Sequence, residues 1–178
     1  MKNKKGFTLL EMLITISIIA FTLPALFAII FVILQQQVKI LRLSEVKRQG
    51  DNLITSMENT IRTNSTNIYS DSSGLLEICN SVSSSGPPTP TSLYFRNKQS
   101  AIFGYNFSSA QPTYFPGTVN LVTSKIIISS PSLSCSRTSL FAPPILKVSF
   151  VISYNTTSTR PEDLASLTYQ TQFALKNY

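Results

Sequence analysis

The sequence predicts an α+β protein in which a long N-terminal helix, membrane-spanning in its first half, packs on a mostly antiparallel β-sheet head. Three observations lead to this fold. Residues 7–34 form an apolar run, residues 35–64 continue with an amphipathic helical pattern, and residues 65–178 change to short β-prone runs between Ser, Pro, Asn and Gly. The 178 residues leave room for one ordinary domain beside the membrane segment.

The apolar run 7–34 contains a single ionisable side chain, Glu11. As a helix the run would be about 42 Å long, which exceeds the roughly 30 Å hydrocarbon core of a bilayer. A secretory signal would have a shorter apolar stretch and a small-x-small cleavage site. A plain single-span anchor explains the length but not the acid. A carboxylate inside a span costs roughly 2.5–3.5 kcal/mol on insertion scales, so it usually marks function.

The stretch Gly6–Glu11, GFTLLE, follows a short basic leader with three lysines. It resembles the processing site of type IV prepilins and type II secretion pseudopilins. The resemblance implies that residues 1–6 are a leader, that a prepilin peptidase cuts after Gly6 and methylates the new N-terminus on Phe7, and that Glu11 steers filament assembly. It also implies the lollipop shape of that family.

Electrostatics suggests a role for Glu11 within this resemblance. Processing would leave an α-amine on Phe7 in or near the bilayer, where an unpaired ammonium and an unpaired carboxylate are both costly. Pairing of Glu11 in one subunit with the Phe7 amine of its neighbour would fix a stagger between them. Such a head-to-tail contact does not close, so it builds a filament.

The amphipathic continuation 35–64 is expected to end near Asn64. Its apolar stripe is expected to pack on the head. Gly50 is expected to weaken the helix, because glycine costs about 1 kcal/mol relative to alanine in a helix interior. Pro24 is expected to kink or locally unwind the membrane segment. The stripe consists of Val46, Leu53, Met57 and Ile61.

The clearest strand of the head is 145–154, where apolar and polar residues alternate with the period of a half-buried strand. The Pro-rich stretch 81–92 is typical of a flexible connection. The closing segment 168–177 resembles the last strand of minor pilins and of J-type minor pseudopilins. The other expected strands are 75–79, 93–96, 101–107, 119–122, 125–129 and 167–175.

The only two cysteines, Cys79 and Cys135, lie far apart in the chain and form no CxxC motif. Downstream of a membrane segment this arrangement favours one disulfide in an oxidising exterior, with two buried free thiols as the alternative. The crosslink would contribute on the order of 4 kcal/mol in the chain-entropy model.

The composition argues against an enzyme and predicts no cofactor or metal. The chain has no histidine, which excludes His-based acid–base and triad chemistry. No nucleotide-binding loop pattern occurs. Glu162 and Asp163 do not belong to an EF-hand pattern, and adjacent carboxylates after Pro161 are more typical of a turn or a first helical turn than of a calcium site.

Nucleic-acid binding is only weakly supported, because the formal charge of +7 includes the three leader lysines. The aromatic residues of the strands 93–96 and 101–107 favour a core over a base-stacking platform. Basic residues just beyond the span, at 39, 42, 47 and 48, favour contact with lipid headgroups or plain solvation over DNA.

The sequence therefore predicts a non-enzymatic minor pilin or pseudopilin of a type IV pilus or type II secretion-type filament. Its expected partners are other subunits, the prepilin peptidase, the inner-membrane assembly platform and membrane lipid. The head is expected outside the cytoplasmic membrane on a single-pass anchor, and later in the filament. Lysines and arginines flank the span on both sides, so this orientation depends on the resemblance. The alternative is an anchored adhesin or binding domain that does not polymerise.

Overall fold

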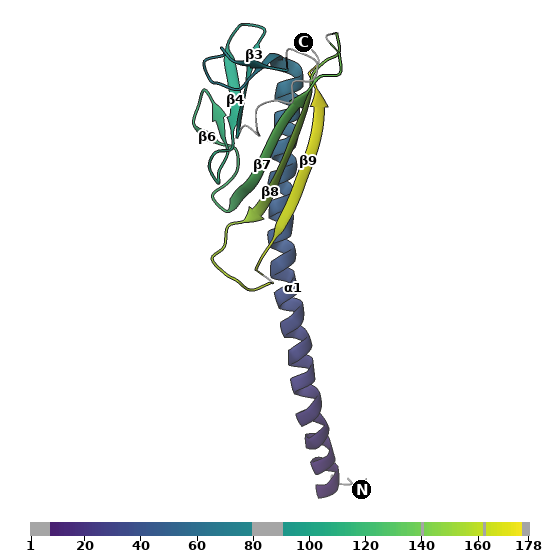
Figure 1. Cartoon of the computed structure of the whole chain (residues 1–178). Helices are drawn as coiled ribbons and strands as arrows, with labels where there is room; N and C mark the ends of the chain where they lie inside the picture. Colours follow the sequence, from purple (N-terminus) through teal and green to yellow (C-terminus); the bar gives the residue numbers. More distant parts are fainter. Residues whose placement is uncertain (1–7, 80–90, 140, 162, 176–178) are drawn as a thin grey trace, which may run out of the picture.

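The computed structural model describes residues 8–79, 91–139, 141–161 and 163–175. A single long helix, α1 (Leu9–Asn64), carries a β-rich head along its C-terminal half, and its N-terminal half extends away from the head (Figure 1). The predicted α+β lollipop is therefore confirmed. Nearly all of the expected flexible connection 81–92 lies outside the described residues.

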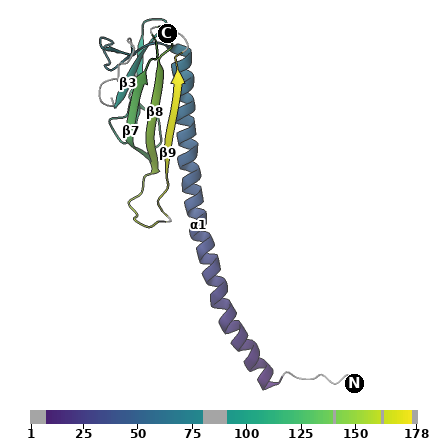
Figure 2. The same ribbon diagram turned by 45° about the vertical axis from the view of Figure 1, so that its right-hand side comes forward.

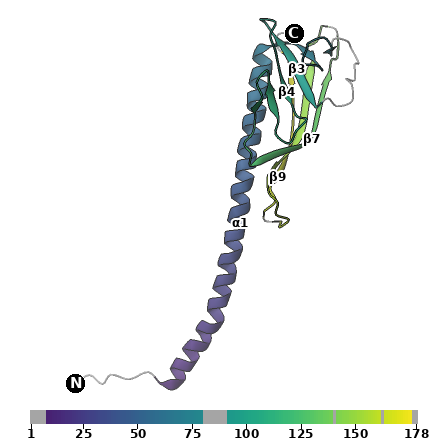
Figure 3. The same cartoon turned by 90° about the vertical axis from the view of Figure 1, so that its left-hand side faces the viewer.

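Helix α1 runs through Pro24 without a break, so no melted segment forms there. Its N-terminal half bends away from the axis of the head-bound half (Figures 2 and 3). The helix ends at Asn64 as expected, where the backbone N–H of Ser65 donates to the carbonyl of Ile61. The hydroxyl of Ser65 donates to the same carbonyl, which satisfies an acceptor of the last turn.

The first sheet is antiparallel and has the strand order β2-β1-β3-β4-β5-β6. At its centre β3 and β4 form a hairpin, at the positions where the sequence predicts the strands 93–96 and 101–107. The strands are β1 (Ser65–Tyr69), β2 (Glu77–Ile78), β3 (Ser92–Asn97), β4 (Ile102–Asn106), β5 (Thr113–Phe115) and β6 (Val119–Asn120).

Two strands of this sheet were not expected, β2 and β6 are shorter than expected, and β4 lacks one residue at each end of the expected strand 101–107. Polar residues at 65–67 suggested a helix end, yet β1 begins directly after α1 and pairs with both β2 and β3. Strand β5 was missed, and β6 ends at Asn120. The expected strand 75–79 shrinks to β2, because the Asp71 carboxylate accepts the backbone N–H groups of Leu75 and Leu76 at 3.3 and 2.8 Å.

The second sheet has the antiparallel order β7-β8-β9, with strands β7 (Ile126–Ser136), β8 (Ile145–Tyr154) and β9 (Ser166–Ala174). Strand β8 has the predicted bounds, and every second residue along it is buried in the core, namely Leu146, Val148, Phe150 and Ile152. Strand β7 is much longer than the expected 125–129, because a register shift between Ser129 and Ser132 accommodates Pro131.

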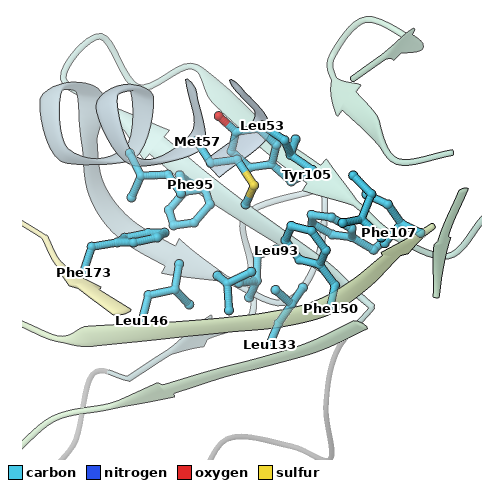
Figure 4. Close-up of a cluster of buried hydrophobic side chains, with 14 of the residues drawn as sticks. Leu53, Met57, Leu93, Phe95, Tyr105, Phe107, Leu133, Leu146, Phe150 and Phe173 are labelled. Atoms are coloured by element: carbon cyan, nitrogen blue, oxygen red, sulfur yellow. The ribbon is translucent and has the colours of Figure 1, made fainter. Parts of the chain in front are cut away.

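One hydrophobic core joins the inner stripe of α1 to both sheets (Figure 4). The predicted stripe is buried, with Val46 and Ile61 fully inaccessible. Phe95 stacks on Phe103 within the first sheet, and Phe107 stacks on Phe150 of the second. The aromatic residues of β3 and β4 are therefore core, as expected, with one exception. Tyr94 lies half-buried on the opposite face, against Phe115.

At Gly50 the side chain of Tyr169 in β9 packs directly against α1. A Cβ at this position would lie 2.4 Å from the ring of Tyr169, so only glycine fits. The Tyr169 hydroxyl lies 2.8 Å from an Asp51 carboxylate oxygen and 3.0 Å from the Lys47 carbonyl. Burial, followed by the Asp51 carboxylate, raises the pKa of Tyr169 to about 12. Gly50 was expected only to weaken the helix, but it makes this contact possible.

The expected disulfide is present between Cys79 and Cys135, with their Cα atoms 6.1 Å apart. Cys79 follows β2 of the first sheet, whereas Cys135 belongs to β7 of the second. The bond therefore ties the two sheets together.

Candidate functional site: the N-terminus of α1

Glu11 lies in the first turn of α1 and forms a capping box with Thr8. Thr8 has extended backbone angles, and its hydroxyl oxygen accepts the Glu11 N–H at 3.3 Å. In return the Glu11 carboxylate accepts the Thr8 N–H at 3.2 Å. This arrangement satisfies two of the free N–H groups at the helix start and folds the carboxylate back toward the chain's N-terminus.

The helix that follows Glu11 is apolar and uncovered by the head. Within the described residues, α1 contains a window with a mean hydropathy of 2.8, none of it buried, which by length and composition suffices to cross a membrane. Leu9 and Phe21 are more than four-fifths exposed. A helix that is apolar all round requires a partner other than water, either lipid or other helices.

Comparison with protein families identifies the motif in the N-terminal segment. Residues 1–23 match the family model described as the prokaryotic N-terminal methylation motif. The chain carries the prepilin-type motif of type IV pilins.

This prepilin-type motif supports a type IV pilin-like processed subunit, and the apolar helix fits a membrane-anchored one. The motif is found in a family of structural subunits, not of enzymes. Thr8 and Glu11 lie inside the matched segment. Gly6 and Phe7 also lie inside it, but outside the residues that the structure describes.

The match ends at Leu23, so it does not extend to the head. Comparisons of the whole chain with curated proteins and with solved structures found no match.

A second polar cluster connects the β8–β9 loop to α1, and the sequence did not reveal it. Arg42 donates to the Asp163 carboxylate at 2.6 Å and to its carbonyl at 2.8 Å. Its guanidinium also lies 5.2 Å from the ring centroid of Tyr154. Asp163 was expected in a turn or first helical turn, but its side chain forms this long-range ion pair. No local sequence signal could have paired residues so far apart.

The carboxylate of Asp163 is held in its charged form by its neighbours. The hydrogen bond from the Ser158 hydroxyl is the largest cause that lowers the pKa of Asp163, followed by the charge of Arg42. We refer to Arg42, Asp163, Ser158 and Tyr154 as the loop clamp. It fixes the β8–β9 loop against the helix just beyond the apolar run.

The remaining candidate residues do not assemble into a site. The Arg48 guanidinium pairs with Glu45 at 2.7 Å on the surface of α1. Phe95, Phe103 and Phe107 are buried, so they cannot stack on bases. Among the described residues, which do not include Glu162, no group of three or more His, Cys, Asp or Glu side chains gathers that could hold a metal ion.

Proposed function

We propose that the protein is a minor pilin or pseudopilin, a structural subunit of a type IV pilus or type II secretion-type filament. A prepilin peptidase cuts after Gly6 and methylates Phe7. The subunit then resides in the cytoplasmic membrane as a single-pass protein with its head outside. The inner-membrane assembly platform incorporates it into the filament.

The observation that carries this proposal is the position of Glu11 at the start of an uncovered apolar helix. Its carboxylate is turned toward Thr8, the residue that follows the proposed new N-terminus. An ammonium on Phe7 of a neighbouring subunit gives this carboxylate a charge partner in the apolar filament core. Both ions are thereby relieved of a large desolvation cost.

The capping box offers a simpler role for Glu11, because a cap alone stabilises a helix by about 1 kcal/mol. The two roles separate cleanly by substitution. Glu11→Gln keeps an N3 side chain that completes a capping box and removes only the charge. Glu11→Ala removes both the charge and the cap.

The test measures the amount of subunit in sheared filaments from cells that carry the cognate assembly machine, after processing has been verified by mass spectrometry. We expect both variants to be processed but neither to assemble, because each lacks the charge. Normal assembly of Glu11→Gln with failure of Glu11→Ala would assign Glu11 to capping and contradict the proposed pairing.

The assignment as a minor subunit is supported by the head. Its closing strand β9 corresponds to the segment that resembles the tails of minor pilins and J-type pseudopilins. A minor subunit is incorporated at few positions, near a tip or in an initiation complex. The alternative, an anchored adhesin that does not polymerise, predicts that the leader stays on the chain and that Glu11→Gln has no assembly phenotype.

A further inference from the structure

A shallow pocket of about 290 Å³ lies between α1 and the β8–β9 loop, below the loop clamp. Apolar side chains of one helix face form one side, and charged side chains of the loop form the other. The lining residues are Phe31, Leu34, Gln35, Val38, Arg160 and Asp163.

The pocket lies at the level of the lipid headgroups if α1 is inserted in a bilayer. A hydrocarbon core of roughly 30 Å accommodates about 20 residues of helix, and the headgroup layers extend the bilayer to about 40–45 Å. Counted from Leu9, the core ends near Ile29. Each headgroup layer is then roughly 5–7.5 Å thick, or about 3–5 residues of helix, so Phe31 lies within it, Leu34 lies at its outer boundary and Val38 lies just outside.

The apolar side of the pocket needs a cover that the head does not supply. Phe31 is 62% exposed, Leu34 54% and Val38 42%. These side chains continue the surface that contacts the acyl chains below them. An apolar surface of this kind is stabilised when lipid or another apolar group removes it from water.

Arg160 supplies the positive charge on the other side. Asp163, which also lines the pocket, is already paired with Arg42 at 2.6 Å. Arg160 makes no ion pair with any residue that the structure describes, and its side chain is exposed. Its backbone is fixed on both sides, since its N–H donates to Ser158 and its carbonyl accepts the Asp163 N–H at 2.9 Å. These bonds thus hold the backbone of Arg160 beside the pocket, which its side chain lines.

We propose that the pocket binds one anionic phospholipid of the leaflet on the head side. Arg160 contacts the headgroup phosphate, and Phe31 and Leu34 contact the glycerol region and the first methylene groups of the acyl chains. The lipid would seat the head on the membrane before assembly. This inference rests on the proposed function in one respect, the insertion of α1 in a bilayer.

The test titrates phosphatidylglycerol or phosphatidylcholine onto the full chain in detergent and counts bound lipid by native mass spectrometry. Arg160→Gln is compared with Lys147→Gln, a matched loss of charge on the outer face of the second sheet. We expect Arg160→Gln to weaken phosphatidylglycerol binding about fivefold, the effect of one basic residue at a lipid surface. Lys147→Gln and the parent should bind it equally and should prefer it to phosphatidylcholine.

Three results would overturn the proposal. Equal binding by the parent and Arg160→Gln would remove the role of the guanidinium. Complete displacement of the lipid by inorganic phosphate would show an anion site without acyl contacts. Impaired filament assembly of Arg160→Gln with unchanged lipid binding would make the pocket a contact between subunits.

The outcome is separable from that of the proposed function. Arg160→Gln should leave cleavage after Gly6 unchanged, whereas Glu11→Gln should leave phosphatidylglycerol binding unchanged and abolish assembly. Failure of either variant to behave in this way identifies which of the two proposals is wrong.

Discussion

At Gly50 the space between α1 and the ring of Tyr169 is sufficient for the hydrogen of glycine but not for a Cβ atom. The tyrosine cannot easily move aside, because its hydroxyl is held by Asp51 and Lys47 and its ring stacks on Phe150 with centroids 5.7 Å apart. Glycine lowers helix propensity at this position, and the packing of β9 compensates for that cost.

Gly50→Ala should therefore destabilise the protein although alanine is the better helix former. Overpacking costs about 1–3 kcal/mol, more than the gain of about 1 kcal/mol in propensity. Urea unfolding of the full chain in detergent, followed by circular dichroism, measures the difference.

The control for Gly50 is a double-mutant cycle with Tyr169→Ala. In that background the ring is gone, and Gly50→Ala should stabilise the protein by about 1 kcal/mol through propensity alone. Stabilisation by Gly50→Ala in both backgrounds would show that the close contact with Tyr169 does not matter.

At the residue scale, the sequence was sufficient to identify residues that stand out within the sequence itself. Glu11 stands out because no other ionisable residue lies in its apolar run, and Cys79 and Cys135 stand out because no other cysteine exists. The functions of Gly50 and Arg42 depend on partners in β9 and in the β8–β9 loop. The roles of Gly50 and Arg42 could therefore not be predicted from the sequence, because only the fold brings these partners together.

Among the elements, the β8–β9 loop is tied to α1 by the ion pair between Arg42 and Asp163. Asp163→Asn removes the charge that holds Arg42, so the loop should open more often. We expect amide hydrogen exchange in residues 155–165 to become several-fold faster, with little change in the strands β8 and β9. Glu58→Gln, which breaks the exposed ion pair with Arg62 on α1, is the matched control and should leave the loop unchanged.

The same contact predicts a pH dependence of the loop. The pKa of Asp163 is lower in the folded protein than its ordinary value of 3.8. The unfolded state therefore binds the proton more readily, and the contribution of the clamp is present above pH 3.8 and is lost as the pH falls through the lower folded value. Loop protection that declines already between pH 7 and pH 5 would contradict this account.

The elements that the sequence predicted well are those with a long, regular pattern. Strand β8 alternates over its whole length, and the stripe of α1 keeps helical spacing. Strands β1 and β5 are short, and pairing with longer neighbours determines them, so a local pattern was insufficient. The expected strand 125–129 stopped short of Pro131, whereas β7 continues past it because a bulge on an edge strand tolerates proline.

At the scale of the whole molecule, the disulfide is a covalent cross-link between the two sheets. Replacing Cys79 and Cys135 together with serine should lower the free energy of unfolding by about 4 kcal/mol, because the closed loop no longer restricts the unfolded chain. Urea unfolding of the oxidised parent and of the double variant measures this loss. The reduced parent should match the variant, and equal midpoints for all three samples would contradict the prediction.

The overall architecture was predictable because its two halves have different chemistry. An uncovered apolar helix and an alternating β-rich head are each recognisable alone, and the stripe of α1 shows how they join. The loop clamp and the pocket beside it arise where the two halves meet, so neither half reveals them separately.

The central claim is that the N-terminal motif is processed so that Glu11 acquires an ammonium partner. Mass spectrometry of the membrane fraction, from cells with an active prepilin peptidase, tests this most directly. We predict a mature chain that begins with N-methylated Phe7. Recovery of the intact chain beginning at Met1, unmethylated and with its leader attached, would contradict the account.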